Sequence, residues 1–307
     1  MQASADAPCT VGNFGPGFDV LSLALAKRGD TVSLQTAEAD SVSVRGAGAD
    51  RVPTEWAKNC ACATIDELRR RTGVRTPLAV MIDKGVPPGS GLGSSASSNA
   101  AAVRAFAKCF RLTLTARDAI MAAGAGEAVA SGSAHHDDVA AALFGGLTIV
   151  GGTVDTVVRV RPPPIHLVVA RPEVDLPTRE MRKLIPDAFP RRDVVQNLSN
   201  VARIIAACHH QDGAMLCRAL DDNLSRPYRA PKVPLFEEMR RAALDAGAVG
   251  FLLSGSGPAT IAALPEGKDP VVVQMSLREA FAKADMQAEV FITRPAPEVH
   301  SPEIRLH

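Results

Sequence analysis

The sequence predicts an α+β protein with two domains. Short runs with strand patterning, such as 41–45 and 78–82, occur among long alanine-rich stretches with helical spacing, such as 95–110. Three consecutive prolines at 162–164 interrupt regular structure and precede a new apolar strand. With 307 residues, 46% of them hydrophobic, the chain is long enough for two domains. We place the boundary near residue 155, which gives domains 1–155 and 156–307.

In the first half, alternating or continuous apolar residues predict strands at 20–25, 31–36, 41–45, 78–82 and 147–150. Apolar residues at helical spacing predict helices at 55–72, about 95–110 and about 115–130. A glycine-rich loop at 85–95 leads into the second of these helices, and a loop containing residues 135–139 precedes the last strand.

In the second half, the same patterns predict strands at 165–170, 249–253, 259–264 and 287–293. Helices are predicted from about 178 and at 193–210, 213–221, 234–246 and 269–284. We expect the tail from Pro295 onward to be frayed or wrapped over the surface.

Charge and composition argue against several classes of partner. The chain has 34 basic and 33 acidic residues, so no global field favours nucleic acid or a membrane surface. Aromatic residues make up only 4%, which disfavours a base-stacking platform. The N-terminus does not resemble a signal peptide, and no apolar run approaches the roughly 18 residues that span a bilayer. Six scattered cysteines without a CxxC pair predict free thiols and a cytoplasmic location.

The glycine-rich loop is the strongest local indication of function. It reads PPGSGLGSSA from Pro87 to Ala96 and is followed at once by a helix. Glycine N–H groups can surround an anion, and the unpaired N–H groups and dipole of the helix face the same anion. Ser94 and Ser95 suit the N-cap of this helix and could reach phosphate oxygens or a metal. The alternative is a plain helix cap after a flexible turn; neither a GxxxxGK[ST] nor a GxGxxG motif is present.

Three segments together resemble the GHMP kinase superfamily, and within it the homoserine kinase family. The glycine-rich loop is similar to the phosphate-binding motif of the superfamily. Residues 7–21 (APCTVGNFGPGFDVL) resemble the opening of homoserine kinases, and residues 247–258, ending in SGSGP, resemble the third superfamily motif. The motifs occur in the family order with family-like spacing. The resemblance implies an N-terminal domain like that of ribosomal protein S5 and a C-terminal ferredoxin-like α/β sandwich.

The resemblance also implies a nucleotide and metal site. Ser95 and Glu127 match the hydroxyl and the helical carboxylate that hold Mg²⁺, a cation that prefers oxygen ligands. The positions that it assigns to ATP are Pro88, Gly89, Ser90, Gly91, Leu92, Gly93, Ser94, Ser95, Ala96 and Gly255.

The implied reaction is ATP-dependent phosphorylation of the side-chain hydroxyl of L-homoserine, in threonine biosynthesis, by a homodimer. The matching substrate positions are Asn13, Asp19, Asp138, Thr178, Arg182 and Arg229. Asp19 would pair with the substrate ammonium, and Arg182 and Arg229 with its carboxylate. Thr178 and Arg182 are four residues apart and would share a helix face. Taken singly, either arginine is more often a solvated surface charge.

The predicted loop HHDDV departs from the family pattern H-x-D-N-V. Asp137 occupies the place of the carboxylate proposed as base in mevalonate-type relatives, and Asp138 stands where the family usually has asparagine. We assign both residues to catalysis, with Asp138 facing the substrate and Asp137 accepting a proton or orienting the loop. An adjacent histidine pair binding a metal is a weaker interpretation. No lysine lies among residues 1–26, which argues against a mevalonate kinase.

Two alternatives remain open at this stage. Asp138 is compatible with a GHMP kinase for another small hydroxylated acid. A catalytically silent member that binds a ligand or a partner protein is also conceivable, although Ser95, Glu127 and the glycine-rich loop are intact.

Overall fold

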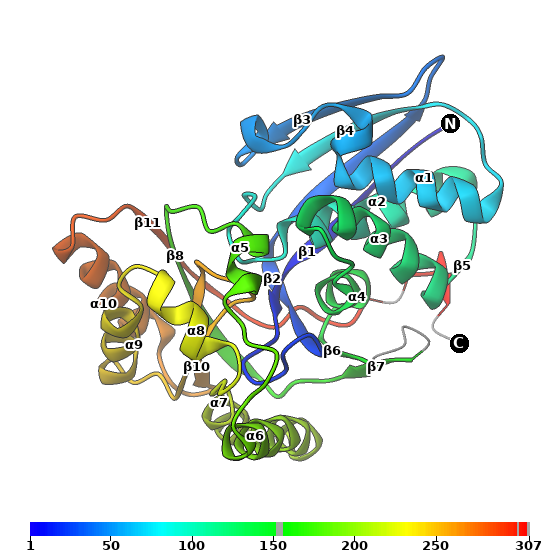
Figure 1. The fold of residues 1–307 in the computed structure, drawn as a ribbon. Coiled ribbons are helices and arrows are strands. Elements are labelled where there is room, and N and C mark those ends of the chain that lie inside the picture. The colour runs from blue at the N-terminus through cyan, green and yellow to red at the C-terminus, as the bar shows by residue number, and fades with distance from the viewer. Residues whose placement is uncertain (152–155, 300, 306–307) are drawn as a thin grey trace.

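A computed structural model describes residues 1–151, 156–299 and 301–305. The chain forms two large sheets, each covered by helices (Figure 1). The first sheet has the order β3-β4-β2-β6-β7, with β1 also paired to β2, and all of its neighbours are antiparallel except β3 and β4. Its strands are β1 (Gln2–Gly12), β2 (Leu21–Thr36), β3 (Ser41–Gly46), β4 (Leu78–Lys84), β6 (Leu147–Val150) and β7 (Val157–Val160).

The predicted strands 20–25 and 31–36 are one long strand, β2. Its first part pairs with β6 and its second part with β4, while β1 runs along both parts. The intervening residues form a bulge, because the register shifts between Pro8 and Thr10 and Arg28 has a φ of +71°. The prediction of a break was therefore wrong: these residues bend the strand without reversing it. The sequence analysis missed β1, whose outer part has small residues of low strand propensity.

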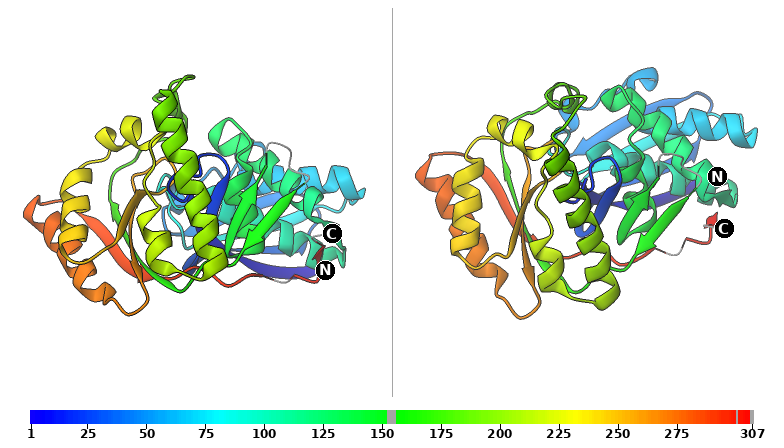
Figure 2. Two further views of the ribbon diagram at one scale, coloured as in Figure 1. Left: turned by 90° about the horizontal axis from the view of Figure 1, so that it is seen from below. Right: turned by 60° about the horizontal axis from the view of Figure 1, so that its bottom comes forward.

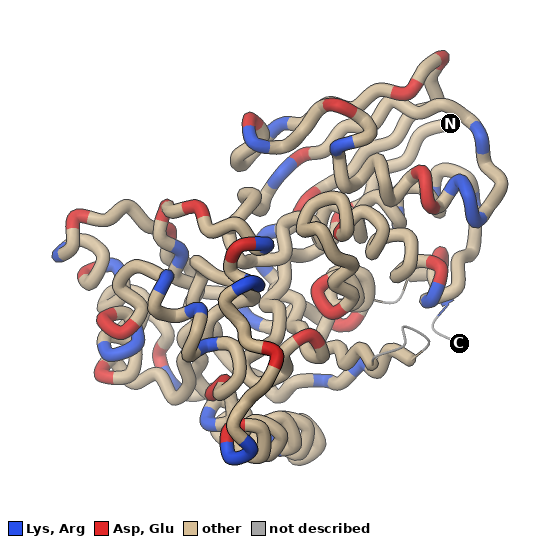
Figure 3. The backbone as a smooth tube through the Cα atoms, in the orientation of Figure 1, with Lys and Arg blue, Asp and Glu red and all other residues tan. Residues whose placement is uncertain are grey.

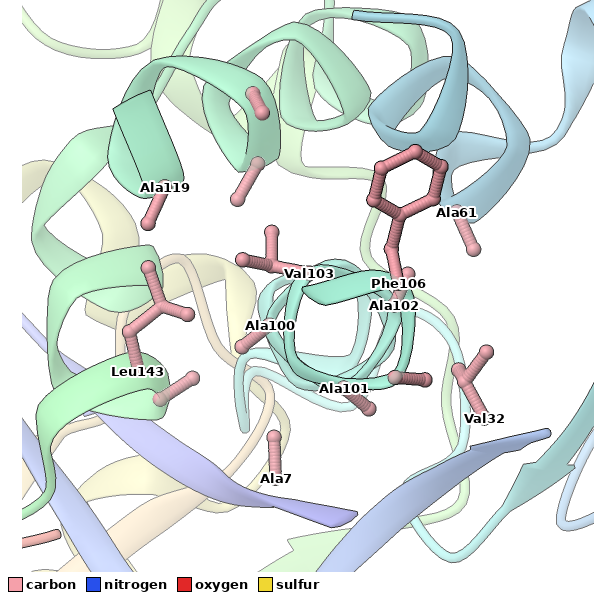
Figure 4. Close-up of a cluster of buried hydrophobic side chains, with 14 of the residues drawn as sticks. Ala7, Val32, Ala61, Ala100, Ala101, Ala102, Val103, Phe106, Ala119 and Leu143 are labelled. Carbon is pink, nitrogen blue, oxygen red and sulfur yellow. The ribbon is translucent and has the colours of Figure 1, made fainter. Parts of the chain in front are cut away.

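Four helices cover one face of the first sheet: α1 (Cys60–Thr72), α2 (Ser94–Phe110), α3 (Ala116–Ser131) and α4 (His136–Phe144). α2 lies between β1 and the other helices, and Figure 4 shows its alanines packed against Ala7 and Val32 of the sheet and against Ala119 and Leu143 of neighbouring helices. Short side chains allow this buried helix to approach its neighbours closely. The predicted helices are confirmed, except that 56–58 is a 3₁₀ turn and Asn59 caps α1.

The second sheet has the antiparallel order β11-β8-β10-β9, with β8 (Ile165–Pro172), β9 (Gly250–Leu253), β10 (Thr260–Pro265) and β11 (Ala288–Thr293). Leu167 and Val169 of β8 face α6 (Arg191–His210) and α7 (Gly213–Arg218), whereas Val168 and Ala170 face α9 (Phe236–Asp245) and α10 (Pro270–Lys283). Apolar residues on both faces explain why this strand reads as a continuous apolar run. The predicted α+β class is confirmed.

One hydrophobic core joins the two sheets. It contains Val11 and Leu23 of the first sheet together with Leu167 and Ile261 of the second. The predicted domain boundary near residue 155 lies outside the described residues. Because β7 pairs with β6, the first sheet continues beyond that point, which favours a division at the prolines 162–164. The two-domain division itself stays a prediction.

The C-terminal tail returns to the first half of the molecule (Figure 2). Pro295 bridges to Leu25, and β12 (Ile304–Arg305) pairs with β5 (Leu114–Thr115). Ile304 is buried in the hydrophobic core between the first sheet and the helices that cover it. Of the two expectations for the tail, wrapping is confirmed for its described part and fraying is wrong there, because buried apolar side chains anchor it.

Charged residues of both signs are interspersed along both halves of the chain (Figure 3). None of the helices in the described part of the chain combines the length and apolar character needed to cross a membrane. All six cysteines are free thiols, as predicted.

Candidate functional site

The three motifs found in the sequence meet in space. The N–H of Thr10 donates to the carbonyl of Leu92 (3.1 Å), and the N–H of Gly255 donates to the carbonyl of Gly12 (3.1 Å). The hydroxyl of Ser254 donates to the carbonyl of Gly91 (2.6 Å). The glycine-rich loop is therefore held between the N-terminal motif and the C-terminal motif.

Glycine is required in this loop for space as well as for conformation. Gly93 has a φ of +60°, and a Cβ there would lie 1.9 Å from Oγ1 of Thr10. A Cβ at Gly91, with a φ of +76°, would lie 2.7 Å from the carbonyl carbon of Gly257. A larger residue at either position would separate the motifs.

The serines after the loop do not cap α2 as predicted. α2 begins at Ser94, and its N-cap is Gly93 in the left-handed conformation without a side-chain hydrogen bond. The Ser94 hydroxyl instead donates backward to the carbonyl of Val86 (2.8 Å). The residue at the N-cap position has a φ of +60°, which glycine adopts easily and serine does not. Glycine therefore occupies the cap position in place of a serine.

A cavity of about 420 Å³ opens beside the loop, with walls from both halves of the chain. The predicted site residues that line it are Asn13, Asp19, Pro88, Gly89, Ser90, Gly91, Gly93, Ser94, Ser95, Glu127, Asp137, Asp138, Thr178, Arg182, Arg229 and Gly255. Leu92 and Ala96 are buried in hydrophobic cores, so any contact that they make with a nucleotide is through their backbone. The roles of the lining residues stay predictions.

A buried ion pair, missed in the sequence analysis, supports the loop. Lys84, at the end of β4, pairs with Asp30 of β2 and also donates to the carbonyl of Ser94 (3.0 Å). Asp30 accepts the N–H groups of Gly85 (3.0 Å) and Val86 (3.1 Å). Both charged side chains are buried, and Lys84 lines the cavity. A lysine directly before a glycine-rich loop could have indicated this contact, but its buried partner lies 54 residues away.

Ser95 and Glu127 form a pocket suited to a cation. Glu127 is buried, and its Oε2 has no hydrogen-bond partner among the residues that the structure describes. Burial raises the pKa of Glu127 to about 7, although the neighbouring Ser95 hydroxyl lowers it in part. An unpaired buried carboxylate oxygen beside a hydroxyl offers the hard oxygen ligands that Mg²⁺ prefers. The residues present therefore fit the implied metal.

Asp137 and Asp138 lie in the first turn of α4 and not in a loop, which corrects the prediction. Carboxylates are favoured at a helix N-terminus, and the alanines that follow are strong helix formers. Oδ1 of Asp138 accepts the hydroxyls of Thr10 (2.6 Å) and Ser22 (2.8 Å). Asp137 is buried, and burial, followed by the charges of Asp138 and Asp19, raises its pKa well above the usual value. Burial also raises the pKa of Asp138, against the effect of the two hydroxyls.

The cavity is also lined by a carboxylate and two arginines, Asp19, Arg182 and Arg229. Arg182 Nη1 donates to Oδ1 of Asp19 (3.1 Å), and Nη2 of the same guanidinium pairs with Oδ2. Arg229 is buried and donates to the carbonyl of Gly255 (3.1 Å), so it is not the solvated surface charge that its sequence alone would suggest. The ring of Phe18 lies under both guanidinium groups, at 5.6 and 5.4 Å. Phe18 was not predicted as a site residue, although it lies within the N-terminal motif.

Comparison with known proteins identifies the family. The model of the GHMP kinases N terminal domain matches residues 59–146, and that of the GHMP kinases C terminal domain matches residues 204–283. The homoserine kinase of Pyrococcus abyssi is 37% identical over 96% of this chain and 97% of its own length. The chain belongs to the homoserine kinase family of GHMP kinases. It is therefore a kinase that uses ATP, and the predicted GHMP kinase fold is confirmed.

Other relatives agree with this assignment. A homoserine kinase of Methanocella arvoryzae is 33% identical over 94% of this chain and 93% of its own length. The crystal structure of homoserine kinase from Cytophaga hutchinsonii superposes with a TM-score of 0.88 at 30% identity, covering 96% of this chain and 95% of that one. The L. major mevalonate kinase shares the fold, with a TM-score of 0.72 at 17% identity.

The buried pair makes a testable prediction about stability. Lys84→Met should lower the free energy of unfolding by about 3–5 kcal/mol, because it leaves the buried Asp30 carboxylate without its counter-ion. Urea unfolding followed by circular dichroism measures the change. The matched control is Lys283→Met, which removes an exposed ion pair with Glu279 and should not move the midpoint. A Lys84→Met protein as stable as the wild type would show that the pair does not support the loop.

Proposed function

We propose that the protein transfers the γ-phosphoryl group of ATP to the side-chain hydroxyl of L-homoserine and so produces O-phospho-L-homoserine, a step of threonine biosynthesis. The observation that carries this proposal is the charge pattern of the cavity. Its walls bring the carboxylate of Asp19 and the guanidinium groups of Arg182 and Arg229 into one cavity with the glycine-rich loop. A zwitterionic amino acid has charges complementary to Asp19 and the two arginines, and a triphosphate suits the loop.

In this proposal, Asp19 receives the substrate ammonium, and the two arginines receive its carboxylate. Burial lowers the pKa of Arg229 to about 10, which still leaves the group charged at neutral pH. Oδ1 of Asn13 accepts a hydrogen bond from the backbone N–H of Asp19 (3.2 Å) and so helps to position the Asp19 backbone. Thr178 shares a hydrogen bond with Ser256 (3.1 Å) and thereby joins α5 (Thr178–Lys183) to the C-terminal motif.

Bound Mg²⁺ and ATP supply the phosphoryl group and neutralise its charge. The protein's contribution is position: the loop glycines present N–H groups, Ser95 and Glu127 offer oxygen ligands, and Lys84 adds a positive charge. Because the pKa of Glu127 is about 7 without a cation, a proton competes with the cation at this carboxylate. Cation affinity should therefore rise as the pH increases through 7.

Asp137 is the candidate proton acceptor. Burial raises its pKa above that of an ordinary carboxylate, which makes it a stronger base for the hydroxyl proton late in the reaction. Asp138 lies beside it, and its contacts with Thr10 and Ser22 fix its orientation in the cavity. The proposal also takes a homodimer as the assembly, as the family resemblance implies, and the cytoplasm as the location, as the free cysteines suggest.

A substrate panel tests the proposed function. ADP release, measured in a coupled assay, should be fastest with homoserine among homoserine, threonine, serine, shikimate and mevalonate. Homoserine amide should perform poorly, because a charge-assisted bond to a carboxylate is worth about 1.5–3 kcal/mol. Preference for another hydroxylated acid would favour a GHMP kinase for that acid, the alternative that Asp138 supports. The proposal would be contradicted if the protein released no ADP with any of the five compounds.

The metal site makes a second prediction. Ser95→Ala combined with Glu127→Gln should reduce kcat at least about 10²-fold, the usual scale for losing electrostatic support of a transition state. The rise of Mg²⁺ affinity with pH around 7 should also disappear in Glu127→Gln. Ser276→Ala with Glu279→Gln makes the same chemical changes on α10, away from the cavity, and serves as the control. Kinetics near those of the wild type in the Ser95 and Glu127 variant would remove the site assignment.

Asp138 makes a third prediction. Asparagine can accept both hydroxyls at Oδ1, so Asp138→Asn should preserve the contacts with Thr10 and Ser22 and retain homoserine kinase activity. Asp137→Asn should cost more, because it removes the proposed proton acceptor. Both variants are compared by kcat and by the homoserine KM. Loss of all activity in a folded Asp138→Asn protein would identify Asp138 as the essential carboxylate.

A further inference from the structure

His135 lines the cavity beside Asp19, directly before α4. We propose that His135 is a positioning residue for amino-acid recognition: its neutral ring accepts a hydrogen bond from Arg182 and holds that guanidinium against Asp19. The inference rests on the proposed function and gives it a residue that governs substrate affinity.

Two hydrogen bonds define the state of the ring. Nε2 of His135 lies 2.8 Å from the hydroxyl of Ser133, and Nδ1 lies 3.3 Å from Nη1 of Arg182. An arginine N–H can only donate, so Nδ1 must be the acceptor and must carry no proton. In the neutral ring the proton is then on Nε2, from which it donates to Ser133. The neighbouring His136 has a different environment, since its ring packs over Gly124 of α3.

The contact completes the support of Arg182. Its Nη1 donates to both Asp19 and His135, and Phe18 lies under the guanidinium plane. Without His135, the arginine would keep the Asp19 pair, which is partly exposed, but would lose its contact on the α4 side. A pre-positioned fork loses less conformational freedom when it binds a carboxylate. His135 therefore acts on the substrate carboxylate through Arg182.

Protonation of His135 would abolish this contact. The charged groups that face the ring are Arg182 on α5, Arg229 on α8 (Arg226–Arg229), Asp19 after β1 and Asp138 on α4. Burial, followed by the charge of Arg182, lowers the pKa of His135, while Asp19 and Asp138 oppose the shift. The ring is therefore neutral at neutral pH and gains a proton only in more acidic solution. Its Nδ1 would then be a donor and would repel Arg182, so the homoserine KM should rise as the pH falls.

Variants of His135 test the proposal in the full-length protein. His135→Ala should raise the homoserine KM about tenfold and leave the ATP KM unchanged, because one hydrogen bond to a charged group is lost. His135→Asn places an amide oxygen near the position of Nδ1 and should return the KM to within about threefold of the wild type. Since asparagine does not titrate, this variant should also lose the acid-side rise in KM. His136→Asn removes the adjacent histidine and is the matched control.

A double-mutant cycle separates positioning from a general structural role. In an Arg182→Ala background, His135→Ala should have no further effect on the homoserine KM, because the residue through which it acts is absent. A full additional tenfold loss in that background would overturn the proposal. So would an unchanged KM in His135→Ala, or an equal rise in the KM for ATP. Circular dichroism melting of each variant shows whether it is folded.

The ligand-free protein gives a readout that does not depend on activity. The imidazole ¹⁵N shifts of His135, assigned by their loss in His135→Asn, should report the tautomer protonated at Nε2 and should change in Arg182→Ala. The opposite tautomer would overturn the inference. If the wild type does not phosphorylate homoserine, the proposed function fails on its own. If it does so with a KM that is insensitive to His135, only the present inference fails.

Discussion

The glycine-rich loop, the Ser254–Gly257 turn and the end of β1 lie directly against one another, and the site depends on this contact. Gly91 and Gly93 pack on the Ser254–Gly257 turn and on Thr10, at distances that leave no room for a Cβ. Through this junction the glycine-rich loop is fixed relative to residues of both halves of the chain. A phosphate cradle works only when its N–H groups are held in position, and here backbone contacts provide that restraint.

The electrostatics of the cavity follow from what surrounds each charge. Lys84 and Asp30 are buried but paired, and together they hold the start of α2 and the two residues after β4. Glu127 and Asp137 are buried, no ion pair is seen for either of them within the described residues, and their pKa values are raised because burial disfavours the charged form. Groups of this kind are typical of sites that bind a cation or move a proton, since they gain a partner only when the site is filled.

The shared hydrophobic core holds the two halves of the chain in a fixed relative position. Val11 of the first sheet and Ile261 of the second lie in the same core, immediately below the junction of the turns. The glycine-rich loop belongs to one half of the chain, whereas Arg182 and Arg229 belong to the other. Phosphoryl transfer requires that donor and acceptor be aligned closely, and a continuous packed core between the halves limits relative movement.

The sequence by itself determined the α+β class, most of the helices and strands, and the position of the glycine-rich loop at the start of a helix. These features are local: they depend on periodicity, on glycine, and on residues close together in the chain. The same locality explains the errors, since β2 is continuous only because β1 pairs across its bulge, and Gly93 replaces serine as the cap of α2 only because Thr10 lies against it.

Only the tertiary structure decided which charged residues share a cavity and how they are paired. Asp30 pairs with Lys84, Asp138 accepts hydrogen bonds from Thr10 and Ser22, and His135 accepts one from Arg182. All of these partners are far apart in the sequence. Burial, which sets the pKa of Glu127 and Asp137, is likewise a property of the packed chain. The type of a residue and its neighbours in the sequence indicate which interactions its side chain can make. Which partner the side chain has, and how exposed it is to water, depends on how distant segments pack.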